Sequence, residues 1–258
     1  MIFAIDMGNT NIVLGCIREN DILFEERLST NLSKTALEYA IDFKNLFEIY
    51  DIDASAVKGA IISSVVPPLT DTIADAVLKV TGKKPMIVGP GVKSGLNIKI
   101  DDPAQLGADL VTGAVAAVAE YPTPLAVIDM GTATTISYID KDGAFCGGPV
   151  IPGVASAVSS LVSATSQLVK ISLMPPKKVI GTNTVDSMKS GAVYGNAALI
   201  DGMLDRMEEE TGEKLNVIAT GGIAKVVIPF CKRKIKIDDS LLLKGLKVIF
   251  DRNYKDKV

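Results

Sequence analysis

The chain has 258 residues, 48% of them hydrophobic and 22% charged, so it can bury a sizeable core and is not a disordered segment. Its net charge of −3 provides no general positive field for nucleic acid or for an anionic membrane surface. The absence of histidine excludes catalytic triads and metal sites built on imidazole, so a base that works near neutral pH would be a carboxylate. Cys16, Cys146 and Cys231 are scattered, which predicts reduced thiols rather than disulfides or a zinc site.

The elements predicted for the first half begin with a β-hairpin. An apolar run leads into Asp6, a glycine-containing loop follows, and a β-rich run begins at Ile12. Next come a turn at 18–21, a strand at 22–28, a helix at 33–50, a buried strand at 57–63 and a helix from Pro67 or Pro68. The apolar spacing in the helix at 33–50 predicts one side with Leu37, Ala40, Ile41, Leu46 and Phe47.

The middle of the chain contains two helix starts. Asp102 and Pro103 have the residue types of a helix N-cap and first position, and after Gly107 an alanine-rich helix runs to Glu120. Asp109 therefore lies in a first helical turn, where the helix dipole stabilises a carboxylate. Aspartate at such a position is usually only a dipole-matching residue, so this observation alone is weak.

The second half opens with another hairpin, in which an apolar run leads into Asp129. The following elements are a turn at 141–143, a helix at 154–168, a long interrupted helix at 186–210, a strand at 217–219 and a helix at 240–251. A proline-rich stretch at 121–124 marks the start of this half. We therefore expect an α/β protein of two related domains, 1–121 and 122–258, each a mixed sheet flanked by helices.

The two hairpins carry related sequences. Asp6-Met7-Gly8-Asn9-Thr10 returns as Asp129-Met130-Gly131-Thr132, and the two aspartates are 123 residues apart, about half the chain. Either match alone would be an ordinary Asp-Gly turn in about half of cases. Two matches at this spacing, each between two strands, favour a shared function.

That function is predicted from the chemistry of phosphate binding. Glycine lets backbone N–H donors approach a phosphate chain, and threonine hydroxyls donate without adding negative charge. The carboxylates of Asp6 and Asp129 can hold the hydrated Mg²⁺ that neutralises the phosphates. We expect the two loops to bind one nucleotide triphosphate. Ala219-Thr220-Gly221-Gly222 fits the approach of an adenine ring, and a plain strand-to-helix turn is the alternative.

Many ordered segments resemble the type III pantothenate kinase family over essentially the whole chain. Besides the two hairpin loops, they include Arg27 to Thr30, Ser64 to Pro67, Gly89 to Val92, Gly107 to Asp109, Asn183-Thr184 and Leu243 to Leu246. The resemblance implies duplicated actin-like (ribonuclease H-like) domains. It also implies phosphorylation of the primary hydroxyl of pantothenate by ATP, the first step of coenzyme A synthesis.

The resemblance also implies roles for individual residues. Asp109 would be the proton acceptor, and Asp6 and Asp129 would lie at cation sites, with Mg²⁺ and a monovalent cation (K⁺ or NH₄⁺) as cofactors. The residues that would contact ATP are Asp6, Met7, Gly8, Asn9, Thr10, Asn11, Ile12, Val13 and Thr132. The residues that would line the substrate pocket are Ile100, Gly107, Ala108, Asp109, Leu110 and Thr184. The family also implies a homodimer.

Two positions depart from the family pattern. Leu110 stands where the family has arginine, and Ile100 stands where it commonly has tyrosine. A charge-assisted hydrogen bond contributes about 1.5–3 kcal/mol, so these departures favour altered or weakened recognition of pantothenate. A kinase of a related alcohol and a nucleotide-binding regulator remain as alternatives, although a regulator would need no base at Asp109.

The N-terminal residues 1–6 lack the basic segment of a signal peptide, and no window approaches the ~18 uncharged apolar residues of a spanning helix. We therefore expect a cytoplasmic protein whose partners are ATP and a small alcohol, without nucleic acid or membrane.

Overall fold

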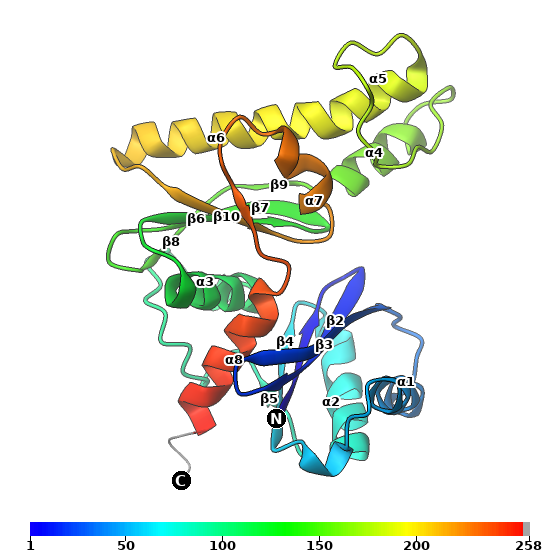
Figure 1. Ribbon diagram of the computed structural model, residues 1–258, viewed down its shortest axis with the longest axis vertical. Coiled ribbons are helices and arrows are strands. Elements are labelled where there is room, and N and C mark those ends of the chain that lie inside the picture. Colours follow the sequence, from blue (N-terminus) through cyan, green and yellow to red (C-terminus); the bar gives the residue numbers. More distant parts are fainter. Residues whose placement is uncertain (255–258) are drawn as a thin grey trace. The chain divides into compact units, whose positions relative to one another are not determined.

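The computed structural model describes residues 1–254 and consists of two units (Figure 1). The first unit contains Met1–Leu96, Asp101–Ala119 and residues 240–254, and the second contains Asn97–Ile100 and Glu120–Asp239. Each unit is therefore made of segments that are not continuous in sequence. The predicted division between residues 121 and 122 differs from this arrangement at residues 97–100 and at the C-terminal helix. That helix joins the first unit because its Leu246 and Phe250 pack with Ile2 and Ile61.

The first unit is built on a five-stranded mixed sheet with the order β3-β2-β1-β4-β5. Its strands are β1 (Ile2–Met7), β2 (Asn11–Arg18), β3 (Asp21–Ser29), β4 (Gly59–Ser64) and β5 (Met86–Ile87). The helices are α1 (Ala36–Ile49), α2 (Pro67–Thr81), α3 (Ala108–Glu120) and α8 (Leu241–Tyr254), with short 3₁₀ turns η1 (Ala54–Ala56) and η2 (Pro103–Gln105). β1 pairs antiparallel with β2 and parallel with β4.

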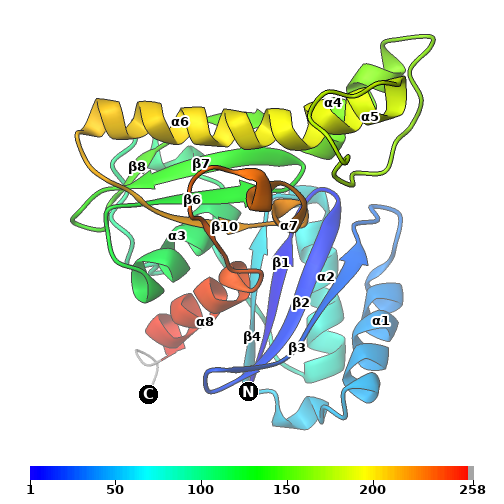
Figure 2. The ribbon, with the colours of Figure 1, turned by 45° about the horizontal axis from the view of Figure 1, so that its top comes forward.

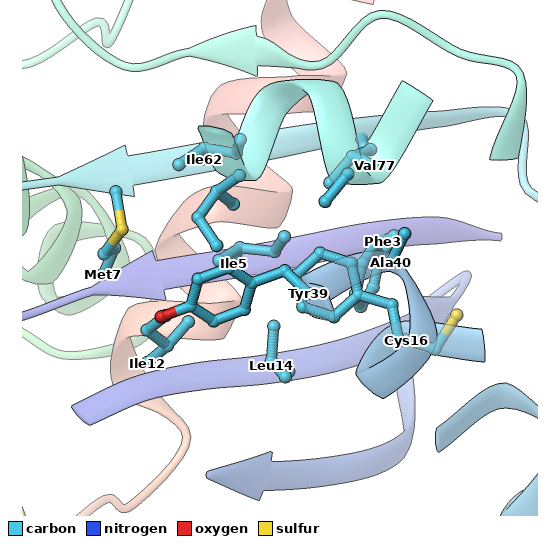
Figure 3. Close-up of a cluster of buried hydrophobic side chains, with 14 of the residues drawn as sticks. Phe3, Ile5, Met7, Ile12, Leu14, Cys16, Tyr39, Ala40, Ile62 and Val77 are labelled. Carbon is cyan, nitrogen blue, oxygen red and sulfur yellow. The ribbon is translucent and has the colours of Figure 1, made fainter. Parts of the chain in front are cut away.

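Each face of this sheet has its own helices. α1 and α2 cover the face that carries Phe3, Ile5 and Met7 of β1, and Figure 3 shows Tyr39 of α1 beside Ile5 and Leu14. α3 and α8 pack against the opposite face, where Ile2 and Ala4 alternate with the first set. Asp6 continues this second row of β1, so it lies on the face that carries α3.

The second unit repeats the plan with the strand order β11-β10-β6-β7-β8, and β9 also pairs with β7. Its strands are β6 (Leu125–Met130), β7 (Ala133–Ile139), β8 (Phe145–Gly147), β9 (Val150–Pro152), β10 (Asn216–Thr220) and β11 (Lys236–Ile237). Its helical segments are α4 (Val154–Ser163), α5 (Thr184–Ser190), the π-helical η3 (Gly191–Gly195), α6 (Asn196–Thr211), α7 (Ala224–Val227) and η4 (Ile228–Phe230). Figure 2 shows α6 running across the sheet over β6 and β7.

The duplication predicted from the two loops is therefore confirmed at the level of topology. In each unit the central strand (β1 or β6) forms an antiparallel hairpin with the next strand and a parallel pair with a later one (β4 or β10). The predicted interruption of the helix at 186–210 is also confirmed, and it is a π-helical turn at Gly191–Gly195.

Two details of the prediction are wrong. Leu37 and Ile41 are exposed by 62% and 49%, because the buried side of α1 is the aromatic stripe that contains Tyr39, Phe43 and Phe47. The helix predicted at 154–168 ends at Ser163. Near that end the Ser163 and Thr165 hydroxyls donate to carbonyls one turn back, and such bonds compete with helix continuation.

Candidate active site

The first of the two predicted phosphate-binding loops connects β1 to β2. Asp6 is only 7% exposed at the end of β1, whereas Asn9 and Thr10 are exposed at the tip. The Gly8 N–H donates to the Asn11 carbonyl at 3.0 Å, which makes the turn tight. The structure thus gathers the predicted nucleotide residues, Asp6 to Val13, in one hairpin.

Side chains from a neighbouring segment fix this loop. The Thr30 hydroxyl donates to the Gly8 carbonyl at 2.6 Å, and the Thr30 N–H donates to the Thr10 carbonyl at 3.0 Å. Asn31 is held in turn by the buried Tyr39, whose hydroxyl accepts from the Asn31 N–H and donates to its carbonyl. The packed aromatic face of α1 therefore positions the loop through three residues, and sequence reasoning did not assign Thr30 this role.

Asp109 lies in the first turn of α3 and is half-buried. Its Oδ1 accepts from the Leu110 N–H at 2.8 Å. Burial raises the pKa of the Asp109 carboxyl above its ordinary value, although hydrogen bonds from the backbone lower it in part. A carboxylate whose pKa is moved toward neutrality is a better proton acceptor at physiological pH.

Gly107 leaves open the space that this carboxyl occupies. A Cβ at residue 107 would lie 2.4 Å from Asp109 Oδ1 and 3.7 Å from Val65, which follows β4. The start of α3 therefore lies beside the carboxyl end of β4, on the sheet face that also carries Asp6. Within the first unit, Asp6 and the segment Gly107 to Leu110 both lie at the carboxyl ends of β1 and β4.

The second loop connects β6 to β7 and has the same backbone bond. The Gly131 N–H donates to the Ala133 carbonyl at 2.9 Å, as the Gly8 N–H does at the start of β2. Asp129 is paired in register with Thr135 of β7 on one side and with Thr220 of β10 on the other. Because paired residues point to the same face of a sheet, Asp129 is flanked by two hydroxyls.

Close backbone approach, rather than a strand-borne threonine, fixes the second loop. Gly153 donates its N–H to the Thr132 carbonyl at 3.2 Å, and a Cβ there would lie 2.4 Å from that oxygen. The Ser156 hydroxyl donates to the same carbonyl at 2.9 Å. Gly221 has a φ of 96°, and a Cβ there would lie 2.6 Å from the Met130 nitrogen. These contacts account for Gly221 without a ligand.

Thr184 lines a cavity of about 730 Å³ in the second unit. Its walls come from α4, α5 and the preceding loop, and include Val154, Leu161, Asn183 and Ser187. Because Gly153 at the start of α4 contacts Thr132, the same helix adjoins both the Asp129 loop and the cavity. The start of α4 therefore contacts the predicted Thr132, and the same helix lines the cavity that contains the predicted Thr184.

The two positions that depart from the family pattern belong to different units. Ile100 is in the second unit, where a Cβ on Gly147 would lie 3.8 Å from it, and Leu110 is in the first. Lys99 beside Ile100 donates from its backbone to Phe145 and forms a 2.8 Å ion pair with Asp140. The segment that contains Ile100 is thus hydrogen-bonded to β8.

Comparison with known proteins agrees with this architecture. Solved structures with the same fold include component A of (R)-2-hydroxyglutaryl-CoA dehydratase from Acidaminococcus fermentans (TM-score 0.56, 14% identity, 99% of each chain covered). An inorganic polyphosphate/ATP-glucomannokinase from an Arthrobacter species has a TM-score of 0.50 at 13% identity, with 98% of each chain covered. These likenesses show the fold alone, which is the duplicated actin-like fold.

Sequence relatives are much more similar. The chain is 41% identical to the type III pantothenate kinase of Exiguobacterium sp. AT1b over 255 residues, covering 99% of this chain and all of the relative. It is also 41% identical to the type III pantothenate kinase of Citrifermentans bemidjiense, over 98% of this chain and all of the relative. The family model described as type III pantothenate kinase matches residues 2–206. The chain therefore belongs to the type III pantothenate kinase family.

Proposed function

We propose that Asp109 is the proton acceptor with which this chain carries out the reaction of its family, the phosphorylation of pantothenate by ATP in coenzyme A synthesis. The observation that carries this role is the half-buried carboxyl in the first turn of α3, with a raised pKa and on the same sheet face as Asp6. As the substrate oxygen bonds to the γ-phosphorus, its proton passes to Asp109. The bond from the γ-phosphorus to the bridging oxygen breaks, and ADP leaves.

ATP would be bound by the β1–β2 hairpin, from Asp6 to Val13, and by Thr132. The backbone N–H groups and hydroxyls at the loop tips are the donors that a phosphate chain needs. Kinases of this family use a divalent cation, which neutralises the phosphate charge when bound. Among residues 1–254 no three His, Cys, Asp or Glu side chains are grouped as a metal site. A single carboxylate such as Asp6, with phosphates and water, is the arrangement that Mg²⁺ prefers.

Asp129 would hold a monovalent cation, K⁺ or NH₄⁺. Its flanking hydroxyls from Thr135 and Thr220 offer neutral oxygen ligands beside one negative charge. One carboxylate with neutral oxygen ligands suits a monovalent cation. Omission of K⁺ should lower turnover, and Na⁺ should not replace it.

The substrate would contact Gly107, Ala108 and Leu110 near the base, with Ile100 and Thr184 contributed by the second unit. Leu110 and Ile100 are half-buried apolar residues. They favour a second candidate function, phosphorylation of a related and less anionic alcohol. If the absence of the arginine side chain at position 110 weakens binding, Leu110→Arg should lower the KM for pantothenate. An unchanged KM would show that the pocket recognises its substrate in another way.

The chain would act as a homodimer in the cytoplasm. Several apolar side chains between residues 161 and 180 of the second unit are exposed, among them Val179 by 62% and Ile180 by 81%, and a subunit contact would cover such side chains. In the described chain, no helix combines the length and the apolar character needed to span a membrane. Sedimentation equilibrium should yield twice the chain mass of 27.2 kDa.

The direct test is an ADP-release assay with ATP, Mg²⁺ and K⁺ across pantothenate, pantetheine and simple hydroxy acids. Ordinary kinase efficiency with pantothenate supports the proposal. Turnover confined to another alcohol would move the function to the second candidate, and nucleotide binding without turnover of any alcohol would leave a regulator.

A further inference from the structure

A buried hydroxyl beside Asp6 is left without a partner. Ser63 ends the buried part of β4 and is 0% exposed, yet its Oγ has no hydrogen-bond partner anywhere in the described chain. Leaving a buried polar group unsatisfied is costly, and such groups in native proteins usually face an ion, a ligand or water.

The sheet register places this serine beside Asp6. Asp6 of β1 and Ser63 of β4 are directly paired in the parallel ladder, so their side chains stand next to each other on one face. That face carries α3, and Gly107 at its start lies near Val65, two residues beyond Ser63. The hydroxyl therefore lies between the Asp6 loop and the helix turn that carries Asp109.

The second unit repeats this juxtaposition. Thr135 is the register partner of Asp129, and its buried Oγ1 also lacks a partner in the described residues. Each of the two aspartates is thus accompanied by an unsatisfied hydroxyl on an adjacent strand. The repetition argues against an isolated packing accident at Ser63.

We propose that the Ser63 hydroxyl is a positioning group for the divalent cation beside Asp6, accepting a hydrogen bond from a water of its hydration shell. Mg²⁺ loses its waters reluctantly and is bound through few carboxylates, so its waters need acceptors from the protein. A serine oxygen offers two lone pairs for that purpose. This inference rests on the proposed nucleotide site and adds to it a residue that contacts the cation only through water.

The test measures binding of the non-hydrolysable analogue AMP-PNP to the full chain by calorimetry, with a Mg²⁺ titration and with EDTA. Ser63→Ala should weaken Mg²⁺-dependent binding about 3- to 10-fold, the effect of one ordinary hydrogen bond. It should raise the half-saturating Mg²⁺ concentration and leave Mg²⁺-free binding unchanged. Because the variant removes an unsatisfied group, the Tm of the free protein should stay equal or rise. If Ser63→Ala is unstable, Ser63→Cys keeps the size but supplies a poor acceptor.

Thr134→Val is the matched control. Thr134 is another buried hydroxyl without a partner in the described residues, but it pairs with Met130, on the opposite face of its sheet from Asp129. This variant should raise the Tm and leave AMP-PNP binding within about 2-fold of wild type. A second comparison uses Asp6→Asn, in which Ser63→Ala should lose its effect on Mg²⁺ dependence.

The outcomes separate the two proposals. If the wild-type chain binds no AMP-PNP, the nucleotide site itself is wrong and the role of Ser63 falls with it. If wild type binds normally and Ser63→Ala leaves the Mg²⁺ dependence unchanged, only the role of Ser63 is overturned. An equal loss of Mg²⁺-free binding would also overturn it, because the hydroxyl would then contact the nucleotide directly.

Discussion

The Asp6 loop and the Asp129 loop share their strand register but not their supports. In both, the glycine N–H after the aspartate donates to the carbonyl that begins the next strand. The first loop is fixed by the Thr30 hydroxyl, whereas the second is fixed by backbone approach at Gly153 and Gly221. Replacing Thr30 should cost one hydrogen bond. At Gly153 and Gly221 the neighbouring backbone leaves no room for any side chain. The two halves should therefore respond differently to mutation.

The largest effect should follow from Asp109→Asn, because Asp109 is the proposed proton acceptor. We expect kcat to fall about 10²- to 10⁴-fold while AMP-PNP binding is unchanged. Steady-state kinetics measure the loss, with Asp102→Asn as control. Asp102 caps η2 by accepting from the Ala104 N–H, and asparagine keeps that cap. An active Asp109→Asn protein would contradict the assignment.

The raised pKa of Asp109 fixes the direction of two pH effects. In the wild type, kcat should fall as pH drops through the raised pKa, above the ordinary value of 3.8, because the base becomes protonated. The folded state binds this proton more tightly than the unfolded chain, so the ionised group costs stability as pH rises through the same window. Asp109→Asn removes that cost, and its Tm at pH 7 should be no lower than that of wild type.

Gly221→Ala should be the most destabilising change among the contacts that fix the second loop. The new Cβ would meet the Met130 nitrogen at 2.6 Å and Asp129 Oδ1 at 2.7 Å, at a φ of 96°. We expect a loss of about 3 kcal/mol in unfolding free energy. Gly212→Ala, with a φ of 69° but no atom within 4 Å of its Cβ, should cost only about 1 kcal/mol. Equal losses in urea unfolding would refute the role of close approach.

Gly107→Ala tests whether the base needs the space left by glycine. The new Cβ would lie 2.4 Å from Asp109 Oδ1, so the carboxyl must move, and we expect kcat to fall about 10- to 100-fold. Gly113→Ala in the same helix meets only Leu242 at 3.6 Å, an ordinary contact. That variant should keep its kcat. A normal kcat for Gly107→Ala would mean that the carboxyl position is not critical.

The smallest effect should come from removing the side-chain hydrogen bonds that hold the two loops. Thr30→Val removes the hydroxyl bond to Gly8, and Ser156→Ala removes the bond to Thr132. Each should weaken AMP-PNP binding by about 1 kcal/mol, or roughly 5-fold. If Ser156→Ala has less effect than Thr30→Val, Gly153 alone suffices to hold the second loop. The reverse order would contradict the difference in supports.

The sequence predicted the parts of the fold that depend on local pattern. Hairpins at Asp6 and Asp129 follow from an apolar run, a glycine and a second β-rich run, and the start of α3 follows from Gly107. The exchange of α8 into the first unit was not predictable, because its apolar stripe fits a sheet in either half. Thr30, Ser156 and the proposed role of Ser63 were missed because they depend on strand register and on contacts between distant segments.

The central proposal is that the Asp6 loop and the Asp129 loop bind the same nucleotide. Calorimetric titration of AMP-PNP with Mg²⁺ into wild type, Asp6→Asn and Asp129→Asn tests it most directly. The account predicts one nucleotide per chain in the wild type and a loss of at least about 10-fold in affinity for each variant. Full affinity in either variant, or two independent nucleotides per chain, would contradict it.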